Sequence, residues 1–296
     1  MNPTTWRLLL TDLQEPALNM AIDEALLMAC EREGSAPVLR LYTWNPPALT
    51  LGRFQKVREE IDLEACRRRG ISIVRRPTGG KAILHDRDLT YSVIGPTSMV
   101  PWGGDILETY RTLSGALVTG LRLLGITAEL LPLRKRAPRR SPFRGACALF
   151  PASYEVAVGG KKLVGSAQKR LRRSFLQHGS IPLFSDVEAN REIFRSPQEN
   201  GAQGQDLWRE KATTISEQVP IPPSYAQIAE AIVRGFREFL GVDLPPAELS
   251  SEELSQAQEL VRLKYARPEW NLQGLESIQR SALSHQLNTG RIERKS

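Results

Sequence analysis

The sequence predicts an α+β protein in which mixed, largely antiparallel sheets are flanked by helices. Strand-like and helix-like patterns follow one another without the regular strand–helix–strand alternation of a Rossmann fold. The 296 residues are 41% hydrophobic and 25% charged, an ordinary globular composition that argues against a disordered chain or a collagen-like fibre. Because no internal repeat or low-complexity linker divides the chain, we expect one domain with a helical C-terminal elaboration.

The first hundred residues are predicted to be rich in strands. Apolar residues at helical spacing predict only two helices there, over 19–31 and 63–69, which end at Gly34 and Gly70. The remaining apolar runs are short and bounded by turn residues, which is typical of strands. They lie at 6–10, 38–44, 48–54, 71–74, 82–84 and 89–94.

The second half is predicted to contain one hairpin and three long helices. Alternating apolar residues around Gly159 and Gly160 indicate the hairpin, and a further strand follows at 174–183. Helical spacing and N-terminal capping residues predict the helices. They lie at 105–124, which ends at Gly125, at 225–240 after Ser224, and at 253–265 after the capping-box pair Ser250 and Glu253.

Positive charge is unevenly distributed along the chain. Forty basic and thirty-three acidic residues give a formal net charge of +7. Six basic residues and no acidic one fall within 134–144, and a second basic cluster comprises Lys169, Arg170, Arg172 and Arg173. Such clusters attract nucleic acid or an acidic carrier protein, or they form a solvated face.

Cysteine usage and hydropathy indicate a reduced compartment. The three cysteines, Cys30, Cys66 and Cys147, form no CxxC pair, so we expect neither a disulfide framework nor a zinc site. No apolar run reaches eighteen residues, and the first residues do not resemble a secretory leader. We therefore expect a cytoplasmic protein without a membrane partner.

A glycine turn at 75–80, RRPTGG, is the first candidate for chemistry. Its two glycines allow backbone N–H groups to approach a ligand, and Arg75 and Arg76 supply positive charge for a phosphate or for holding the turn. The segment lacks both phosphate-loop patterns, so a simple hairpin is the competing interpretation. His85 follows the turn and is suited to orienting a substrate or moving a proton.

The second candidate region surrounds Cys147 and Lys162. Cys147 follows the densest positive charge in the chain, and nearby cations lower a thiol pKa and so favour the nucleophilic thiolate. A free cysteine is more often a small buried hydrophobe. A lysine beside a glycine turn is ordinarily solvated, but on a strand facing a cleft Lys162 would stabilise developing negative charge.

Several motifs in the same order resemble the biotin/lipoate protein ligase superfamily, on the lipoate side. The resemblance covers about residues 5–271 and implies a ligase-like catalytic domain over 1–271, with a polar tail at 272–296. The matching motifs are NMAIDEALL (19–27), LGRFQ (51–55), RRPTGGKAILHDRDLTYSV (75–93), GKKLVGSAQKR (160–170), FLQHGSI (175–181) and KYARPEWN (264–271).

Within that superfamily, a cysteine just before the YEV strand is similar to the cysteine-dependent octanoyltransferases. The resemblance implies that Cys147 is the nucleophile, that Lys162 is the active-site lysine and that the 75–85 segment lines an acyl-binding groove. Two departures are Lys81 at the third position of the glycine run and Ala148 with Leu149 after the cysteine. The substrate-binding residues implied are Arg75, Arg76, Thr78, Gly79, Gly80, His85, Gly165, Ser166 and Ala167.

The resemblance implies an octanoyl transfer that needs no metal and no cofactor. Acyl carrier protein would supply the octanoyl group, and a lysine of a lipoyl domain or of the glycine cleavage H protein would receive it. The leading alternative is an ATP-dependent lipoate ligase, which adenylate formation from ATP and free acid would reveal. A third alternative, a basic nucleic-acid-binding protein, would bind in a steeply salt-dependent manner, but no nucleic-acid motif supports it.

Overall fold

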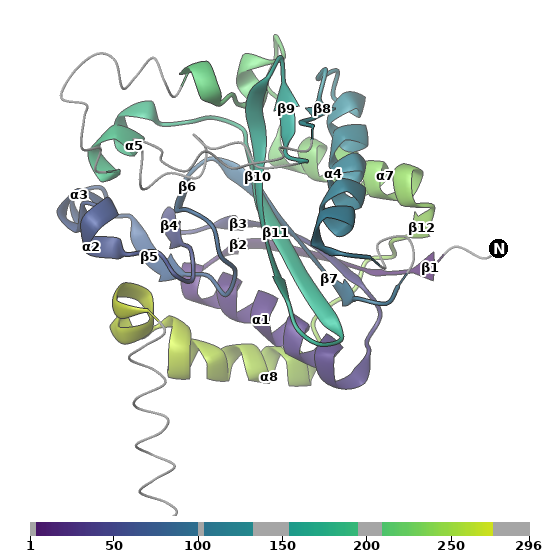
Figure 1. Ribbon diagram of the computed structural model, residues 1–296, viewed down its shortest axis with the longest axis horizontal. Helices are drawn as coiled ribbons and strands as arrows, with labels where there is room; N and C mark the ends of the chain where they lie inside the picture. The colour runs from purple at the N-terminus through teal and green to yellow at the C-terminus, as the bar shows by residue number, and fades with distance from the viewer. Residues whose placement is uncertain (1–3, 100–103, 133–153, 195–208, 275–296) are drawn as a thin grey trace, which may run out of the picture.

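The computed structural model describes residues 4–99, 104–132, 154–194 and 209–274, and a seven-stranded sheet forms its centre (Figure 1). Only the β2–β3 pair is parallel in this sheet, and every other neighbouring pair is antiparallel. The predicted fold class, mixed and largely antiparallel, is therefore confirmed. In order, the strands are β2 (Arg7–Gln14), β3 (Val38–Trp44), β7 (Asp88–Pro96), β11 (Ser174–Pro182), β10 (Lys161–Arg170), β9 (Val156–Val158) and β8 (Glu129–Leu130).

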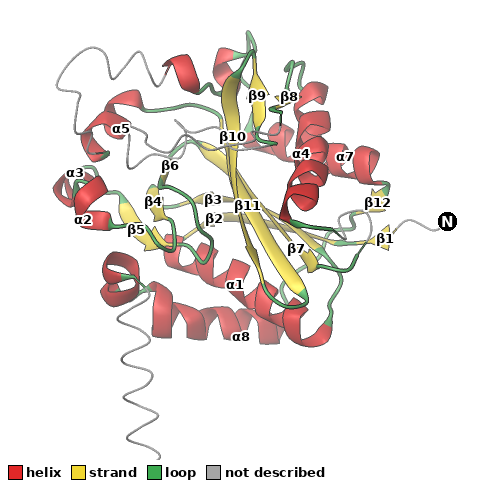
Figure 2. Cartoon of the chain, viewed as in Figure 1, coloured by secondary structure: helices red, strands yellow, loops and turns green. Residues whose placement is uncertain are grey.

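Helices cover both faces of this sheet (Figure 2). On one face lies α1 (Pro16–Glu33), with α8 (Ser251–Leu260) packed along it. On the opposite face α4 (Ile106–Leu123) and α7 (Tyr225–Leu240) pack against each other. Because strand side chains alternate between faces, each face has its own apolar core, one under α4 and α7 and the other under α1.

A three-stranded sheet with its own small core lies beside the central sheet. Its strands are β5 (Ser72–Arg75), β4 (Ala48–Leu51) and β6 (Ile83–His85), in that order. The short helices α2 (Val57–Glu60), α3 (Leu63–Arg68) and α5 (Val187–Ile193) supply apolar residues to this core. The strand β1 (Thr4–Thr5) pairs separately with β12 (Val242–Asp243).

Local capping signals fix the long helices. The Ser224 hydroxyl accepts from the backbone N–H of Gln227, whose side chain accepts from the N–H of Ser224, so α7 begins with the capping box. Gly241 ends the same helix in the left-handed region at φ 63°, as Gly34 ends α1 at φ 66°. These signals are why the helix predicted over 225–240 has the same bounds in the structure.

Other predicted elements differ from the structure in their bounds. The helix predicted over 19–31 begins at Pro16, which suits the first turn because it needs no N–H there. The strand predicted over 48–54 ends at Leu51. The helix predicted over 253–265 becomes a π-helix at Val261–Tyr265, and a second π-helix spans Glu269–Gln273. The described residues end at 274, so most of the polar tail predicted at 272–296 lies outside them.

A close glycine contact joins α4 and α7. A Cβ built on Gly235 would lie 2.3 Å from the Gly120 backbone nitrogen and 2.6 Å from the Ala116 carbonyl oxygen. Both neighbouring groups are helix backbone, which cannot move aside as a flexible side chain would. The two helices can therefore approach this closely only because residue 235 has no side chain.

We expect Gly235→Ala to destabilise the protein by about 1–3 kcal/mol, since the new methyl group must push the helices apart. Denaturant-induced unfolding measures this change. Glu230→Ala, which alters an exposed residue of the same helix, is the control and should change stability by less than about 0.5 kcal/mol. An unchanged or raised stability of Gly235→Ala would contradict the packing described.

Candidate functional site

A layer of polar side chains lies between α1 and the central sheet. On β7, Leu89, Tyr91 and Val93 enter the core beneath α4 and α7, so alternation turns Thr90 and Ser92 toward α1. The same alternation turns Arg40 and Tyr42 of β3 and His178 of β11 toward α1. Since nearly all of these side chains are buried, each polar group needs a partner within the protein.

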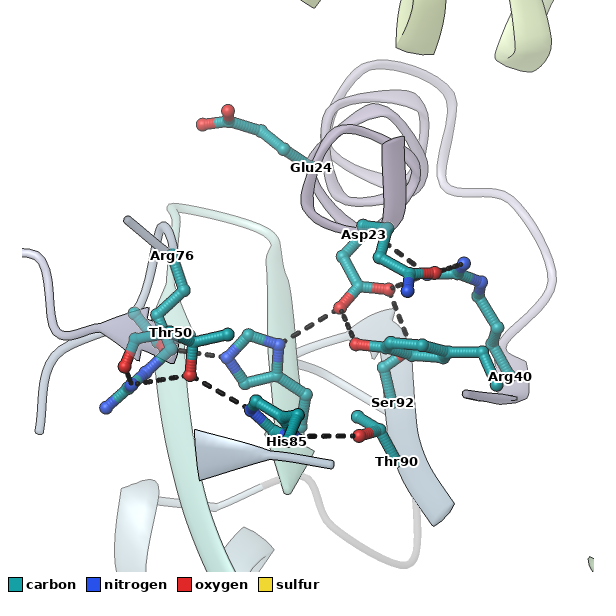
Figure 3. Close-up of polar contacts among 12 residues, drawn as sticks. Asp23, Glu24, Arg40, Thr50, Arg76, His85, Thr90 and Ser92 are labelled. Carbon is teal, nitrogen blue, oxygen red and sulfur yellow. Dashed lines mark hydrogen bonds and ion pairs between the residues drawn. The ribbon is translucent and has the colours of Figure 1, made fainter. Parts of the chain in front are cut away.

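Asp23 of α1 is the centre of this layer and has no exposed surface (Figure 3). Four donors surround its carboxylate: Arg40 Nη1 at 2.8 Å, Tyr42 Oη at 3.0 Å, Ser92 Oγ at 2.9 Å and His178 Nδ1 at 3.0 Å. Burial alone would raise the pKa of Asp23, but the His178 hydrogen bond and the charge of Arg40 outweigh burial and lower it. Asp23 is therefore a buried carboxylate.

A second histidine–carboxylate pair lies nearby. His85 Nδ1 is 2.8 Å from Asp88 Oδ2, and the same oxygen accepts from Thr90 Oγ1 at 3.0 Å and Ser180 Oγ at 2.6 Å. The Trp44 ring stacks on the imidazole with centroids 4.3 Å apart. His85 is thus held by a hydrogen bond at its edge and by an aromatic ring on its face.

Arg76 bonds to the glycine turn and reaches both histidines through threonine hydroxyls, and Figure 3 shows the link through Thr50 to His85. Its Nη2 donates to the carbonyl oxygens of Gly79 at 2.8 Å and Lys81 at 2.7 Å. Its Nε lies 3.2 Å from Thr78 Oγ1, and its Nη1 lies 3.1 Å from the Thr50 carbonyl oxygen and 3.2 Å from Thr50 Oγ1. The guanidinium therefore holds the turn from inside.

The turn also requires glycine at a neighbouring position. A Cβ built on Gly52 would lie 1.8 Å from the Gly80 carbonyl oxygen, and Gly80 has φ 89°. A Cβ built on Gly80 would lie 3.9 Å from Ala167 Cβ, so the turn lies next to β10. This contact between distant backbones explains why β4 ends at Leu51, before Gly52.

Arg75 has a different environment from Arg76, although the sequence analysis assigned both to substrate. Its side chain is 1% exposed and donates to the carbonyl oxygens of Gly52, Arg53, Gln55 and Trp270. Its backbone N–H donates to Asn271, and it lines neither cavity of the site. The described contacts of Arg75 therefore join the turn to the C-terminal segment, and its predicted substrate contact stays a prediction.

Two adjacent cavities bring most of the predicted residues together. The larger encloses about 900 Å³, part of it open to solvent, and is lined by Lys162, Leu163, Gly165 and Phe184 among others. Ile83 and Ser180 line both cavities, so the two adjoin. The smaller cavity is lined by Arg76, His85, Ser166, Ala167 and His178 together with the apolar side chains of Met20, Trp44 and Ile83.

Lys162 is buried rather than solvated. Only 4% of the residue is exposed, and its Nζ lies 2.6 Å from Oε1 of Glu155, a residue that is buried to the same extent. The pair spans the β9–β10 hairpin, whose turn at Gly159 and Gly160 has positive φ at both residues, as the sequence predicted for a hairpin. Lys162 thus lies on a rigid strand and faces the larger cavity.

Cys147 and the basic stretch at 134–144 lie outside the described residues, so their assigned roles stay predictions. The second basic cluster is largely engaged within the protein. Lys169 pairs with Glu24 at 3.4 Å, Arg170 donates to the carbonyls of Gly104 and Asp105, and Arg173 donates to the Glu31 carbonyl. This cluster therefore offers less free charge than its sequence indicated.

Several participants of the site carried no assignment from sequence, among them Asp23, Glu155 and Thr50. Asp23 lies inside the NMAIDEALL motif, where helical spacing alone does not separate it from a surface acid. Glu155 precedes a strand and gains its partner only when the hairpin folds. Thr50 lies in an apolar strand as an ordinary β-former. The only signal that the sequence offered for them was a polar residue within an apolar run.

Neither a metal site nor a membrane span emerges from residues 4–99, 104–132, 154–194 and 209–274. In these ranges, no three histidine, cysteine, aspartate or glutamate side chains are grouped as metal ligands would be. No helix within the same ranges combines the length and apolarity needed to cross a bilayer.

Comparison with known proteins connects this geometry to a family. The model of the lipoyl protein ligase A/B catalytic domain matches residues 15–237. Octanoyltransferase LipM of Brevibacillus brevis is 42% identical over 271 residues, with 90% of this chain and 98% of that protein covered. Octanoyltransferase LipM of Kyrpidia tusciae is 44% identical over 270 residues, with 90% and 98% covered. The bipartite lipoate protein ligase of Thermoplasma acidophilum, solved in a study of that ligase and its E2 lipoyl domain, is structurally similar, with a TM-score of 0.77, 28% identity and coverage of 92% and 98%.

We expect Glu155→Gln to destabilise the protein by about 3–5 kcal/mol, because it leaves the buried Lys162 without its charge partner. Denaturant-induced unfolding at neutral pH measures the change. Glu129→Gln is the matched control, since Glu129 is exposed on the neighbouring strand β8, and it should shift stability by less than about 0.5 kcal/mol. Equal effects of the two substitutions would contradict the burial of the pair.

We expect the melting temperature to fall as the pH is lowered below about 6.5. Burial lowers the pKa of His178 from its ordinary value of 6.5, although Asp23 opposes this shift. Between the two pKa values the unfolded chain binds more protons than the folded chain, so the free energy of unfolding falls by up to about 1.4 kcal/mol per pH unit.

Thermal melts of the wild type and of His178→Asn across this range test the assignment. The variant lacks the titrating group and should lose less stability over the same range. If both proteins lost the same amount, another group would be responsible for the pH dependence.

Proposed function

The chain belongs to the lipoyl protein ligase A/B catalytic domain family and is an octanoyltransferase, and we propose that it transfers the octanoyl group through a thioester on Cys147. The observation that carries the proposal is Lys162, a buried lysine on β10 that is paired with Glu155 and lines the larger cavity. Such a lysine is suited to stabilising the negative charge of an acyl-transfer intermediate.

The first half-reaction acylates the enzyme. The Cys147 thiolate attacks the carbonyl carbon of an octanoyl thioester on acyl carrier protein, and the new sulfur–carbon bond replaces the carrier's carbon–sulfur bond. The carrier thiolate leaves and takes up a proton. Because one thioester replaces another, the step is nearly neutral in free energy and needs no ATP.

The second half-reaction forms the product amide. The neutral lysine amine of a lipoyl domain or of the glycine cleavage H protein attacks the thioester carbon, and a carbon–nitrogen bond forms. The Cys147 sulfur leaves and takes up the proton that the nitrogen releases. Lys162 favours the thiolate in the first step, then positions the amine and stabilises the oxyanion in the second. The structural relationship to a lipoate protein ligase studied with its E2 lipoyl domain supports a lipoyl domain as acceptor.

The smaller cavity is the proposed site of the octyl chain. Met20, Trp44, Ile83 and Ala167 give it apolar walls, and each buried methylene contributes about 0.8 kcal/mol to binding. The adjoining larger cavity contains Lys162, so a chain in the smaller cavity leaves the acyl carbonyl toward the lysine. We place the reaction in the cytoplasm, where thiols remain reduced.

Each half-reaction can be tested separately. Incubation with octanoyl acyl carrier protein alone should give a wild-type adduct of one octanoyl group by mass spectrometry, which Cys147→Ala should not form. Lys162→Ala should slow amide formation on an apo lipoyl domain by about 10²- to 10³-fold. Lys161→Ala, a change at the exposed neighbouring lysine, should leave this rate unchanged.

Two outcomes would overturn the proposal. Full transfer by Cys147→Ala would exclude the thioester route, and unimpaired amide formation by folded Lys162→Ala would remove that residue from the mechanism. Omission of ATP from every assay separates transfer from adenylate-forming ligation, since only transfer proceeds without ATP. Melting curves of each variant show whether a loss of rate reflects unfolding.

A further inference from the structure

Two chains of hydrogen bonds with the same residue types converge on Arg76. The first runs from Asp23 through His178 and Thr78, and the second runs from Asp88 through His85 and Thr50. In each chain the aspartate contacts the histidine Nδ1, and the threonine hydroxyl contacts the histidine Nε2. Thr78 belongs to the glycine turn and Thr50 belongs to β4, far earlier in sequence, yet both contact the Arg76 guanidinium.

The direction of the hydrogen bonds in the first chain follows from the chemistry of its ends. Asp23 is a carboxylate and can only accept, so His178 Nδ1 donates the proton of this 3.0 Å bond. The buried neutral imidazole then accepts at Nε2, and the Thr78 hydroxyl donates to it across 2.7 Å. The hydroxyl oxygen is left to accept from Arg76 Nε.

The second chain has the same directions. Asp88 Oδ2 already accepts from two hydroxyl groups, so His85 Nδ1 donates to it as well. With its Nδ1 proton directed at Asp88, His85 presents Nε2 to the Thr50 hydroxyl, which donates across 3.0 Å. Thr50 Oγ1 and the Thr50 carbonyl oxygen then accept from Arg76 Nη1.

We propose that the two aspartate–histidine–threonine chains position the Arg76 guanidinium, and with it the glycine turn beside the acyl cavity, for octanoyl transfer. One chain fixes Nε and the other fixes Nη1, so Nη2 has a single direction and holds the Gly79 and Lys81 carbonyls. Asp23, His178, Thr50 and Thr78 are thus positioning residues for the reaction, an inference that rests on the proposed function.

The position of the turn matters because its outer face is available to a substrate. Within the described residues, neither Gly79 nor Gly80 donates a backbone hydrogen bond. Arg76 holds the carbonyl oxygens of Gly79 and Lys81, and Gly80 lies beside Ala167, which lines the smaller cavity. A turn held on one side and free on the other presents fixed N–H donors to an acyl group, whereas a loose turn does not.

The protonation pattern can be tested without any assay of activity. In the wild-type protein labelled with ¹⁵N-histidine, we expect His85 and His178 each to carry a proton on Nδ1 and none on Nε2. Long-range ¹H–¹⁵N spectra identify the protonated nitrogen, and His85→Asn and His178→Asn assign the signals. A proton on Nε2 of either ring would overturn the corresponding chain.

Kinetics of threonine variants test the positioning role. Thr78→Val and Thr50→Val remove one hydroxyl with almost no change of shape, and each should lower the rate of acyl-enzyme formation about tenfold. Thr78→Ser and Thr50→Ser keep the oxygen and should recover most of that loss. Thr119→Val removes a hydroxyl that bonds to a helix carbonyl on α4, outside both chains, and should not change the rate.

The double variant distinguishes shared from independent action. If both hydroxyls act through Arg76, the double valine variant should lose clearly less rate than the product of the two single losses. A fully multiplicative loss, or valine variants that melt at lower temperature but keep the wild-type rate, would overturn the proposal. A wild-type protein without octanoyl transfer would refute the proposed function instead, and the histidine spectra would still report on the chains.

Discussion

The buried carboxylate of Asp23 is the interaction on which the arrangement of the site depends. A charge without exposed surface is expensive to bury unless several donors replace water, and here β3, β7 and β11 each provide at least one donor. Helix α1 can therefore sit on the sheet in only one position. Through His178, which lines the smaller cavity and contacts Thr78, Asp23 is connected to the glycine turn.

How far the fold could be predicted depended on whether the signal was local. Helix α7 was predicted with its exact bounds because its capping box and its terminal glycine lie within the helix ends. Helix α5 and strand β8 were not predicted, because elements this short show no clear apolar periodicity in the sequence. Their stability comes from contacts with residues distant in sequence. Strand β4 is shorter than predicted for the same reason, because a local sequence pattern cannot show the contact between Gly52 and the distant Gly80.

The site shows the same division between local and distant information. The glycine turn and Lys162 were identified because glycine pairs and a lysine close to one are visible in the sequence, but the burial of Lys162 with Glu155 was not. Arg75 and Arg76 looked equivalent as neighbours. Successive side chains of extended backbone point to opposite sides, so one guanidinium faces the C-terminal segment and the other faces the cavity.

The C-terminal segment contacts two elements of the site, α1 and the glycine turn. Lys264 and Tyr265 both contact Glu24 on α1, at 2.5 Å and 2.7 Å, one residue after Asp23. Trp270 accepts from Arg75 through its carbonyl oxygen and donates through its indole to the Arg75 carbonyl, and Asn271 contacts the Arg75 backbone N–H. The last described helices thus fasten together α1 and the glycine turn, the two elements whose relative position Asp23 and Arg76 define from the inside. This explains in physical terms why the motif at 264–271 occurs together with the motifs at 19–27 and 75–93.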